Sequence, residues 1–328
     1  MKILFAIQGT GNGHLSRARD IIPHLQNYGE LDLMVSGTQA QVSLTQNLTY
    51  KKHGFSFVFG KNGGIDYLGT AKIIRLGELF KDIRSLPVEK YDLIINDFEP
   101  ITAWACKWKK IPSVALSHQS AFLSSKTPKV KTFDLLGPAV LKNYAPSTYQ
   151  VGFHFARYDD FIYTPIIRKE IRELVISNNG HYTVYLPAFD DVLLVNYLTQ
   201  LPDVKWQVFS KHNKENYTNR NVEVIRIDNA IFNKSLSACA GLLTGGGFES
   251  PAEALFMGKK VFAIPMKGQY EQQCNAEALR LMGVPVMYEI NQNFVEKLKI
   301  WVAETQNIKV DYPEETAKIV EGLMKYKR

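Results

Sequence analysis

Short apolar runs alternate with longer amphipathic segments along most of the chain. In the first half, β-branched and aliphatic runs indicate strands at residues 2–8, 31–35, 55–59, 92–96 and 113–116. Between them, apolar residues recur at helical spacing, as in segments 15–28 and 68–85. This alternation is typical of a parallel sheet covered by helices, so the first half predicts an α/β domain.

The pattern stops between residues 137 and 168, where three prolines interrupt a stretch rich in Tyr and Phe that could lead into a second domain. From residue 182 it restarts, with strands expected at 182–186, 204–209, 222–227, 241–244, 260–264 and 284–288. Helices are expected at 229–240, 251–257 and 271–282. The simplest architecture is α/β with two Rossmann-like, doubly wound parallel-sheet domains, 1–164 and 165–328, facing a central cleft. An amphipathic helix at 313–328 could pack back on the first domain.

Composition narrows the classes of partner. Of 328 residues, 45% are hydrophobic and 22% charged, which excludes a disordered or low-complexity chain. The formal net charge of +7 favours anionic partners such as phosphorylated metabolites, lipid surfaces or nucleic acid. Three scattered cysteines predict neither a disulfide framework nor a zinc site and fit a cytoplasmic location. No apolar run approaches the roughly 20 residues of a membrane-spanning helix, so membrane contact would be peripheral.

The first glycine cluster follows the first predicted strand and reads Gly9, Thr10, Gly11, Asn12, Gly13 and His14. A dinucleotide fingerprint would place its third glycine where His14 stands, which weighs against a nicotinamide or flavin enzyme. Near the positive end of a helix, His14 is expected to stay neutral and could act as a general base. The alternative is that His14 caps or packs the tight turn.

The second glycine cluster leads from a predicted strand into a predicted helix and reads Thr244, Gly245, Gly246, Gly247 and Phe248. Ser250 suits the N-cap and Pro251 the first helical position, and Glu253, three residues after the cap, completes a capping box. Helix-start chemistry alone explains those residues, but it does not explain three glycines. A glycine-rich turn at a helix N-terminus offers N–H groups that suit a diphosphate.

A third polar segment follows the next predicted strand. Its amide and carboxylate side chains are Gln269, Glu271, Gln272 and Asn275. Such groups can bind the hydroxyls of a sugar with both donors and acceptors. An exposed polar helix start is the alternative interpretation.

With these clusters in order, the chain resembles the GT-B glycosyltransferases, specifically the MurG-like and UDP-glycosyltransferase branch. The match in the second half follows the family's T-x-G-G, S-x-x-E and Q-x-x-N-A pattern through Thr244, Gly245, Gly246, Ser250, Glu253, Gly258, Pro265, Glu271, Gln272, Asn275 and Ala276. Gly11, Asn12, Gly13 and His14 resemble the family's G-x-G-H loop.

The resemblance implies that the first domain binds the acceptor and the second binds a nucleotide sugar, with a UDP-sugar as the family expectation. It implies that Glu253 holds the ribose and that Gly246 and Gly247 face the diphosphate. Glu271 and Gln272 would contact the donor sugar, and His14 would lie near the reaction centre.

Two departures from the family pattern stand out. Glu271 replaces a frequent Asp, so its contact with the donor sugar could differ. The first strand of the second domain is not followed by a Gly-Gly-Ser turn, and Lys211, after the next strand, is a possible substitute phosphate contact.

These features predict inverting transfer of a sugar to an acceptor hydroxyl, with no cofactor and no metal, because no D-x-D motif is present. His14 is the first candidate base. Asp97 and Glu99, at the end of a strand, are alternatives, unless they serve only to cap the next helix. His118 ends the following strand and is expected on the acceptor side, with Gly11, Asn12 and Gly13. The acceptor could be lipid-linked or a polysaccharide.

Two other classes remain open. A sugar-nucleotide epimerase or hydrolase could use the same fold and would consume the donor without any acceptor. A non-catalytic nucleotide-sugar binder is the other class. Nucleic acid is not expected, because no recognition motif accompanies the basic runs. Trp104 and Trp108 lie four residues apart in a basic helix, which favours contact with an anionic membrane on the cytoplasmic face, unless they are packed.

Overall fold

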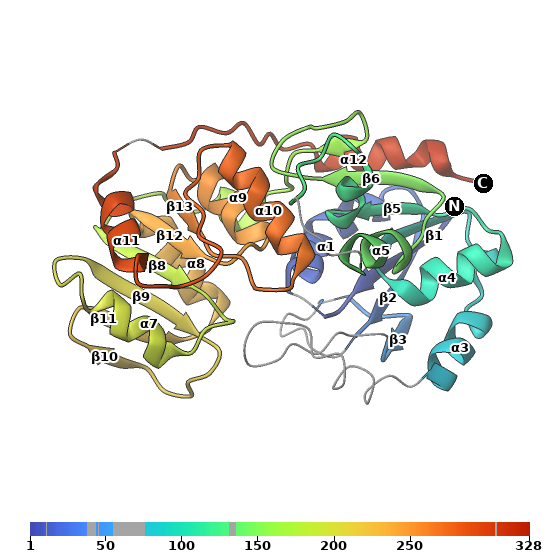
Figure 1. Ribbon diagram of the computed structural model, residues 1–328. Coiled ribbons are helices and arrows are strands. Elements are labelled where there is room, and N and C mark those ends of the chain that lie inside the picture. The colour runs from blue at the N-terminus through green and yellow to red at the C-terminus, as the bar shows by residue number, and fades with distance from the viewer. Residues whose placement is uncertain (11, 38–43, 45, 55–75, 131–135, 306) are drawn as a thin grey trace.

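The computed structural model describes residues 1–10, 12–37, 44, 46–54, 76–130, 136–305 and 307–328. In this part of the chain, two β-sheets with helices packed around them form the two lobes seen in Figure 1. Both labelled ends of the chain lie on the lobe built around the first sheet (Figure 1).

The first sheet has seven described strands in the order β3-β2-β1-β4-β5-β6-β7, all parallel. The strands are β1 (Lys2–Gln8), β2 (Glu30–Ser36), β3 (Tyr50–Lys52), β4 (Leu93–Asp97), β5 (Val114–Ser117), β6 (Tyr149–Phe153) and β7 (Ile162–Tyr163). Strand β1 is buried from residue 3 to residue 8, which is why its sequence is a continuous apolar run. The chain reverses its direction of travel across the sheet between β1 and β4, where α/β sheets bind ligands.

The second sheet has the order β10-β11-β9-β8-β12-β13 among the described residues, and only β10 is antiparallel to its neighbour. The strands are β8 (His181–Tyr185), β9 (Lys205–Ser210), β10 (Tyr217–Asn219), β11 (Val222–Arg226), β12 (Gly241–Thr244) and β13 (Lys260–Ala263). Here the direction of travel reverses between β8 and β12. The second glycine cluster therefore leaves the sheet at its own switch point.

Helices connect most of these strands. They are α1 (Asn12–Gln26), α3 (Leu76–Ser85), α4 (Pro100–Lys109), α5 (Leu136–Asn143), α6 (Lys169–Arg172), α7 (Asp191–Leu198), α8 (Asn229–Ala238), α9 (Glu249–Phe256), α10 (Tyr270–Leu281), α11 (Phe294–Ala303) and α12 (Thr316–Leu323). The short 3₁₀ helices are η1 (Val88–Lys90), η2 (Gln119–Leu123) and η3 (Met324–Tyr326). Side chains cap several of these helices, as where Asp228 accepts from the N–H of Ile231 at the start of α8.

The predicted strands 2–8 and 241–244 coincide with β1 and β12, and most others agree within two residues. The expected strand at 284–288 is wrong, because only a single bridge, Ala263 to Val286, joins it to the sheet. The stretch 137–168 is not simply a connection, since it contains α5, β6 and β7. Strands β3 and β10 and helix α11 had no counterpart in the expected pattern. The expected strand 55–59 lies outside the described residues.

The end of the chain returns to the first lobe. Helix α12 packs against α1, and both lie in that lobe in Figure 1. The Arg328 guanidinium donates to the Tyr91 carbonyl, and the Arg328 N–H donates to the Asp92 carbonyl 2.9 Å away. None of the described helices has both the length and the apolar character needed to cross a membrane.

Candidate active site

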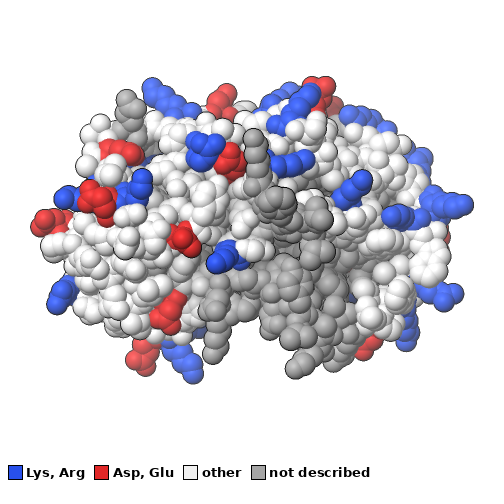
Figure 2. All heavy atoms as spheres, viewed as in Figure 1, with Lys and Arg blue, Asp and Glu red and all other residues white. Residues whose placement is uncertain are grey.

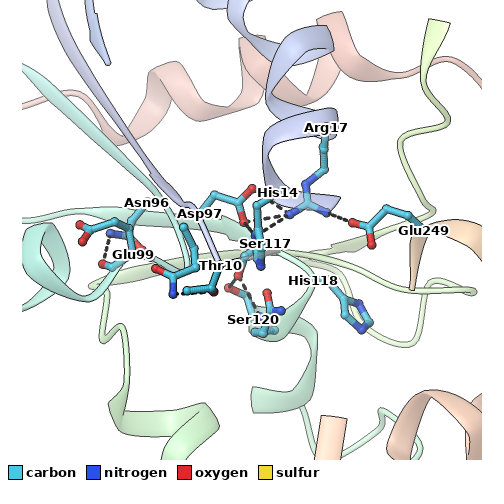
Figure 3. Close-up of polar contacts among 12 residues, drawn as sticks. Thr10, His14, Arg17, Asn96, Asp97, Glu99, Ser117, His118, Ser120 and Glu249 are labelled. Carbon is cyan, nitrogen blue, oxygen red and sulfur yellow. Dashed lines mark hydrogen bonds and ion pairs between the residues drawn. The ribbon is translucent and has the colours of Figure 1, made fainter. Parts of the chain in front are cut away.

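Parallel pairing brings the first glycine loop beside the end of β4. In the register of β1 and β4, Ile7 pairs with Asp97, and α1 starts a few residues after Ile7. His14 lies in the first turn of α1, and its Nδ1 is 2.7 Å from Asp97 Oδ1 (Figure 3). Two residues 83 positions apart therefore form an imidazole–carboxylate pair at the switch point of the first sheet.

Arg17, one turn after His14 on α1, joins this pair to the second domain. Its Nη2 donates to both carboxylate oxygens of Asp97, each 2.8 Å away. Its Nη1 donates to Glu249 Oε1 at 2.7 Å, and Glu249 is the first residue of α9. The arginine is 2% exposed and lies between the two carboxylates in Figure 3. A bonded chain thus runs from His14 through Asp97 and Arg17 to Glu249.

The charges along this series of hydrogen bonds set the protonation states of Asp97 and His14. Burial alone would raise the pKa of Asp97, but Arg17 and His14 outweigh burial and hold it below its ordinary value. Burial alone would lower the pKa of His14, but attraction to Asp97 and the hydrogen bond to it raise the pKa above its ordinary value. The expectation that the helix N-terminus keeps this imidazole neutral was therefore wrong in direction. Asp97 engages Nδ1, which leaves Nε2 as the ring atom able to take a substrate proton.

Glu99 serves as the cap of α4, which was the alternative to its role as a base. It is fully buried and caps α4, where its carboxylate accepts from the N–H groups of Ile101 at 2.8 Å and Thr102 at 2.6 Å. The Ser36 hydroxyl donates to it as well, at 2.6 Å. Phe98, between Asp97 and Glu99, has φ of 56°, a left-handed conformation that is rare for a bulky residue. Strain of this kind concentrates at functional sites.

The second glycine cluster lies between β12 and α9. A Cβ added at Gly246 would lie 2.4 Å from the Gln272 carbonyl oxygen, so close packing requires glycine there. A Cβ added at Gly247 would meet nothing within 4 Å, so packing among the described residues does not explain this glycine. Open backbone ahead of a helix N-terminus is the arrangement that binds phosphate groups.

The sequence matches the family model of glycosyl transferase family 1 over residues 1–303. The chain belongs to this family. Among solved structures, it is similar to the glycosyltransferase of kitacinnamycin, with 13% identity, a TM-score of 0.63, and coverage of 99% of this chain and 94% of that one. It is also similar to MurG of Acinetobacter baumannii, with 14% identity, a TM-score of 0.55, and coverage of 98% and 94%. The glycosyltransferase VinC in complex with dTDP gives 13% identity, a TM-score of 0.52, and coverage of 99% and 95%. No curated protein matches the sequence.

These likenesses establish the fold of this family 1 glycosyltransferase as GT-B, with two parallel-sheet α/β domains. The start of α9 nevertheless differs from the predicted capping box. The helix begins at Glu249 with Phe248 at the N-cap, and Ser250 lies inside it, so Ser250 is not the cap. Phe248 is 4% exposed and stacks on His118 with ring centroids 3.9 Å apart. Both residues therefore form a contact between the domains and are not open to a ligand, whereas the sequence predicts Phe248 on the donor side and His118 on the acceptor side.

Glu253 is tied to a residue that sequence reasoning missed. Its carboxylate is 2% exposed and accepts from Arg168 Nε at 2.5 Å and from Arg168 Nη2 at 2.8 Å. The pair is therefore bidentate and buried, the geometry in which arginine holds a carboxylate most firmly. A ribose hydroxyl can reach Glu253 only by sharing or opening this pair.

The start of α10 holds the other predicted donor contacts. Asn275 is fully buried, donates to the Gly246 carbonyl at 3.0 Å and lies 2.8 Å from His118 Nε2, so it links the two domains and is not open to a sugar. Gln269 caps the helix through the N–H of Gln272. The Gln272 side chain accepts in turn from the N–H of Met266. Glu271 is partly open, with 21% of its side chain exposed.

Lys211, Asn12, Gly13 and Thr244 lie after β9, at the start of α1 and at the end of β12. Lys211 is exposed after β9, with its Nζ 5.8 Å from the Tyr185 ring centroid. A Cβ added at Gly13 would lie 2.6 Å from the Glu249 carboxylate, so glycine allows the two domains to approach. Asn12 begins α1, and Gly11 lies outside the described residues. Thr244 ends β12 and is 3% exposed.

Proposed function

We propose that this glycosyltransferase moves a sugar from a nucleoside diphosphate donor to an acceptor hydroxyl, with inversion. The observation that carries the proposal is the bonded chain from His14 through Asp97 and Arg17 to Glu249. These hydrogen bonds connect the imidazole–carboxylate pair of the first domain to the start of α9. Of the three candidate bases, His14 is the one whose geometry suits proton transfer.

The reaction follows from this arrangement. His14 Nε2 removes the acceptor proton while the acceptor oxygen attacks the anomeric carbon of the donor. The bond from that carbon to the diphosphate oxygen breaks, and the diphosphate leaves with the electron pair. Asp97, held ionised by Arg17, stabilises the imidazolium that forms. Backbone N–H groups of the glycine turn and the α9 dipole stabilise the departing charge.

The finer part of the proposal is the nucleobase of the donor. A UDP-sugar is the first candidate, and a dTDP-sugar is the next because the similar structure of VinC is a complex with dTDP. Transfer is proposed to need no metal and no cofactor, because helix and backbone groups supply the diphosphate contacts. The described residues contain no cluster of three or more His, Cys, Asp or Glu side chains that could hold a metal ion.

Donor consumption tests the reaction. The purified protein is incubated with UDP-glucose, UDP-N-acetylglucosamine or dTDP-glucose, with and without a mixture of lipid and carbohydrate acceptors, and released nucleoside diphosphate is measured in the presence of EDTA. Transfer predicts release that depends on the acceptor mixture and is lost in His14→Ala. Equal release without any acceptor would show the hydrolase alternative, and conversion of the donor sugar without release would show the epimerase.

We further propose peripheral contact with an anionic membrane on the cytoplasmic side, which would suit a lipid-linked acceptor. On α4, Trp108 is 56% exposed, and Trp104, at 37%, is partly covered, with part of its ring open to solvent. Lys107 Nζ lies 4.5 Å from the Trp104 ring centroid, and the Arg84 guanidinium lies 5.5 Å from that of Trp108. Phe80, on the neighbouring helix α3, is also 56% exposed.

Exposed aromatic side chains among cations are typical of membrane interfaces. Figure 2 shows Lys and Arg side chains along the outer edge of the first domain, in the region of α4 and the C-terminus. Co-sedimentation with vesicles tests the proposal: binding to phosphatidylglycerol vesicles should exceed binding to phosphatidylcholine vesicles and should fall in Trp108→Ala. Equal sedimentation of the wild type and Trp108→Ala would contradict it. Trp206, fully buried in the second domain, is no suitable control, so exposed Tyr217→Ala serves instead.

A further inference from the structure

A cavity of about 470 Å³ lies in the first domain at the carboxyl ends of β4 and β5. Its floor includes Asn96 and Ser117 from these strands, and α5 contributes Leu141 and Lys142. Tyr270, at the start of α10, closes it from the second domain. The cavity thus spans the two domains, and its size suits a molecule of one or two sugar rings.

Two buried polar atoms in the wall have no hydrogen-bond partner. Gln119 is 6% exposed, and its Nε2 donates to Glu271 while its Oε1 bonds to nothing in the described chain. Ser147 Oγ is likewise buried without a partner. A buried polar atom without a partner is costly, and turning either side chain toward the cavity would let a ligand hydroxyl satisfy it. The wall therefore suits a ligand that carries hydroxyl groups.

The charge of the lining is one-sided. Lys129 and Lys142 contribute to it, and no Asp or Glu does among the described residues. Both lysines are exposed, and the Lys129 ammonium group donates to the Ser124 carbonyl at 2.9 Å. Phe98, Phe122 and Leu141 supply apolar surface of the kind on which a sugar ring can pack. A hydroxylated ring in the cavity and an acidic group near its exposed lysines match these features.

The cavity also adjoins the reacting groups. Phe98 belongs to its wall, follows Asp97 directly, and has its ring centroid 6.5 Å from that of His14. On the other side, Gln119 donates to Glu271, a predicted donor-sugar residue with 21% of its side chain exposed. We propose that the cavity holds the acceptor and that the acceptor is a hydroxylated ring bearing an acidic group, either a carboxylate or a phosphate. This inference rests on the proposed glycosyl transfer and specifies its substrate class.

Binding measured without donor tests the inference separately from transfer. Saturation-transfer NMR and calorimetry are run with methyl β-glucuronide and glucose 6-phosphate as acidic probes and methyl β-glucoside as the neutral one. The wild type should bind at least one acidic probe about tenfold more tightly than the neutral one, as one charged hydrogen bond allows. The two acidic probes distinguish a carboxylate from a phosphate.

Variants locate the binding. Lys142→Glu should abolish the preference for the acidic probe, and Lys142→Arg should retain it. Lys234→Glu, the same charge change on exposed α8 of the second domain, should leave it intact. Gln119→Leu should weaken all three probes to a similar extent, since it removes a hydroxyl contact.

Equal affinity for acidic and neutral probes, an unchanged preference in Lys142→Glu, or no saturable binding of any probe at about 10 mM would each overturn the inference. None of these outcomes bears on whether a nucleoside diphosphate binds. Conversely, binding of the acidic probe without binding of any nucleotide would support the ligand class proposed for the cavity and contradict the proposed transfer.

Discussion

Replacing Asp97 by Asn removes one charge from the centre of the bonded chain while keeping nearly the same shape. Asp97 accepts from His14 Nδ1 at 2.7 Å and twice from Arg17 Nη2 at 2.8 Å. The amide of Asn has one oxygen in place of two, so its NH₂ group must face one of these donors. Loss of the carboxylate from such a pair lowers kcat by about 10⁴-fold, because the imidazole is no longer held with Nε2 ready to accept a proton.

The same change should cost stability. Breaking a buried charge pair costs about 3–5 kcal/mol, and we expect the low end, about 3 kcal/mol, because Arg17 keeps Glu249 at 2.7 Å as a second carboxylate. Because Asp97 raises the pKa of His14, its loss should also move the acidic limb of the profile of kcat against pH to lower pH. In the wild type that limb should lie above the ordinary pKa of histidine.

The assay is release of nucleoside diphosphate at saturating donor and acceptor across the pH range, with urea unfolding measured in parallel. Asp32→Asn is the matched control, since Asp32 lies on β2 and accepts hydrogen bonds from Tyr91 and Thr49 at 2.7 Å, away from the site. It should leave kcat and the acidic limb unchanged. If Asp97→Asn retained kcat within about fivefold of the wild type, or left the acidic limb in place, the assignment of His14 as an Asp97-held base would be refuted.

Three further predictions concern the second domain and pH. Gly246→Ala should weaken nucleotide binding and lower the free energy of unfolding by about 1–3 kcal/mol or more, because its Cβ meets the Gln272 carbonyl at 2.4 Å. Gly247→Ala should leave urea unfolding unchanged and should lower only the nucleotide affinity measured by calorimetry. Glu253→Gln should lower the free energy of unfolding by about 3–5 kcal/mol, and Glu253→Leu combined with Arg168→Met should recover most of it; equal unfolding midpoints for Glu253→Gln and the wild type would contradict the buried pair. The lowered pKa of Asp97 implies stability that is present above the ordinary carboxyl pKa and lost as pH falls through the lowered value, so the unfolding free energies of the wild type and Asp97→Asn should converge in acid.

The sequence could predict those parts of the fold that depend on local pattern. Strands buried on both faces read as unbroken apolar runs, which is why β1 and β12 have their predicted bounds. Glycine loops after such strands, and polar residues at their carboxyl ends, pointed to His14 and Asp97. Their pairing needs only that β1 and β4 be neighbours, which a doubly wound sheet supplies.

The parts that depend on distant contacts could not be predicted in this way. Arg17 stands three residues after His14, on the same face of α1, but its burial makes sense only with Asp97 and with Glu249, 232 residues away. The capping box failed because Arg168 takes the Glu253 carboxylate and His118 covers Phe248. The available signal for Arg17 was a charged residue on the buried face of α1, close to the first glycine cluster.

The stretch 137–168 misled for a different reason. Its prolines suggested a connection between domains, whereas part of it forms β6 of the first sheet, where Phe153 is buried and pairs with Tyr163 of β7. Aromatic enrichment at alternate positions favours a strand, and all three prolines of the stretch lie outside β6 and β7.

A thermal-shift titration with UDP, dTDP and the matching monophosphates tests the central claim most directly, namely that the turn from Gly245 to Gly247 and the start of α9 hold a nucleoside diphosphate. A ligand that binds only the folded protein adds about 2.7 kcal/mol of stability at 100 times its Kd. We predict a concentration-dependent rise in Tm with at least one diphosphate, a smaller rise with its monophosphate, and loss of the difference in Gly246→Ala. No rise with any diphosphate at millimolar concentration would contradict the claim.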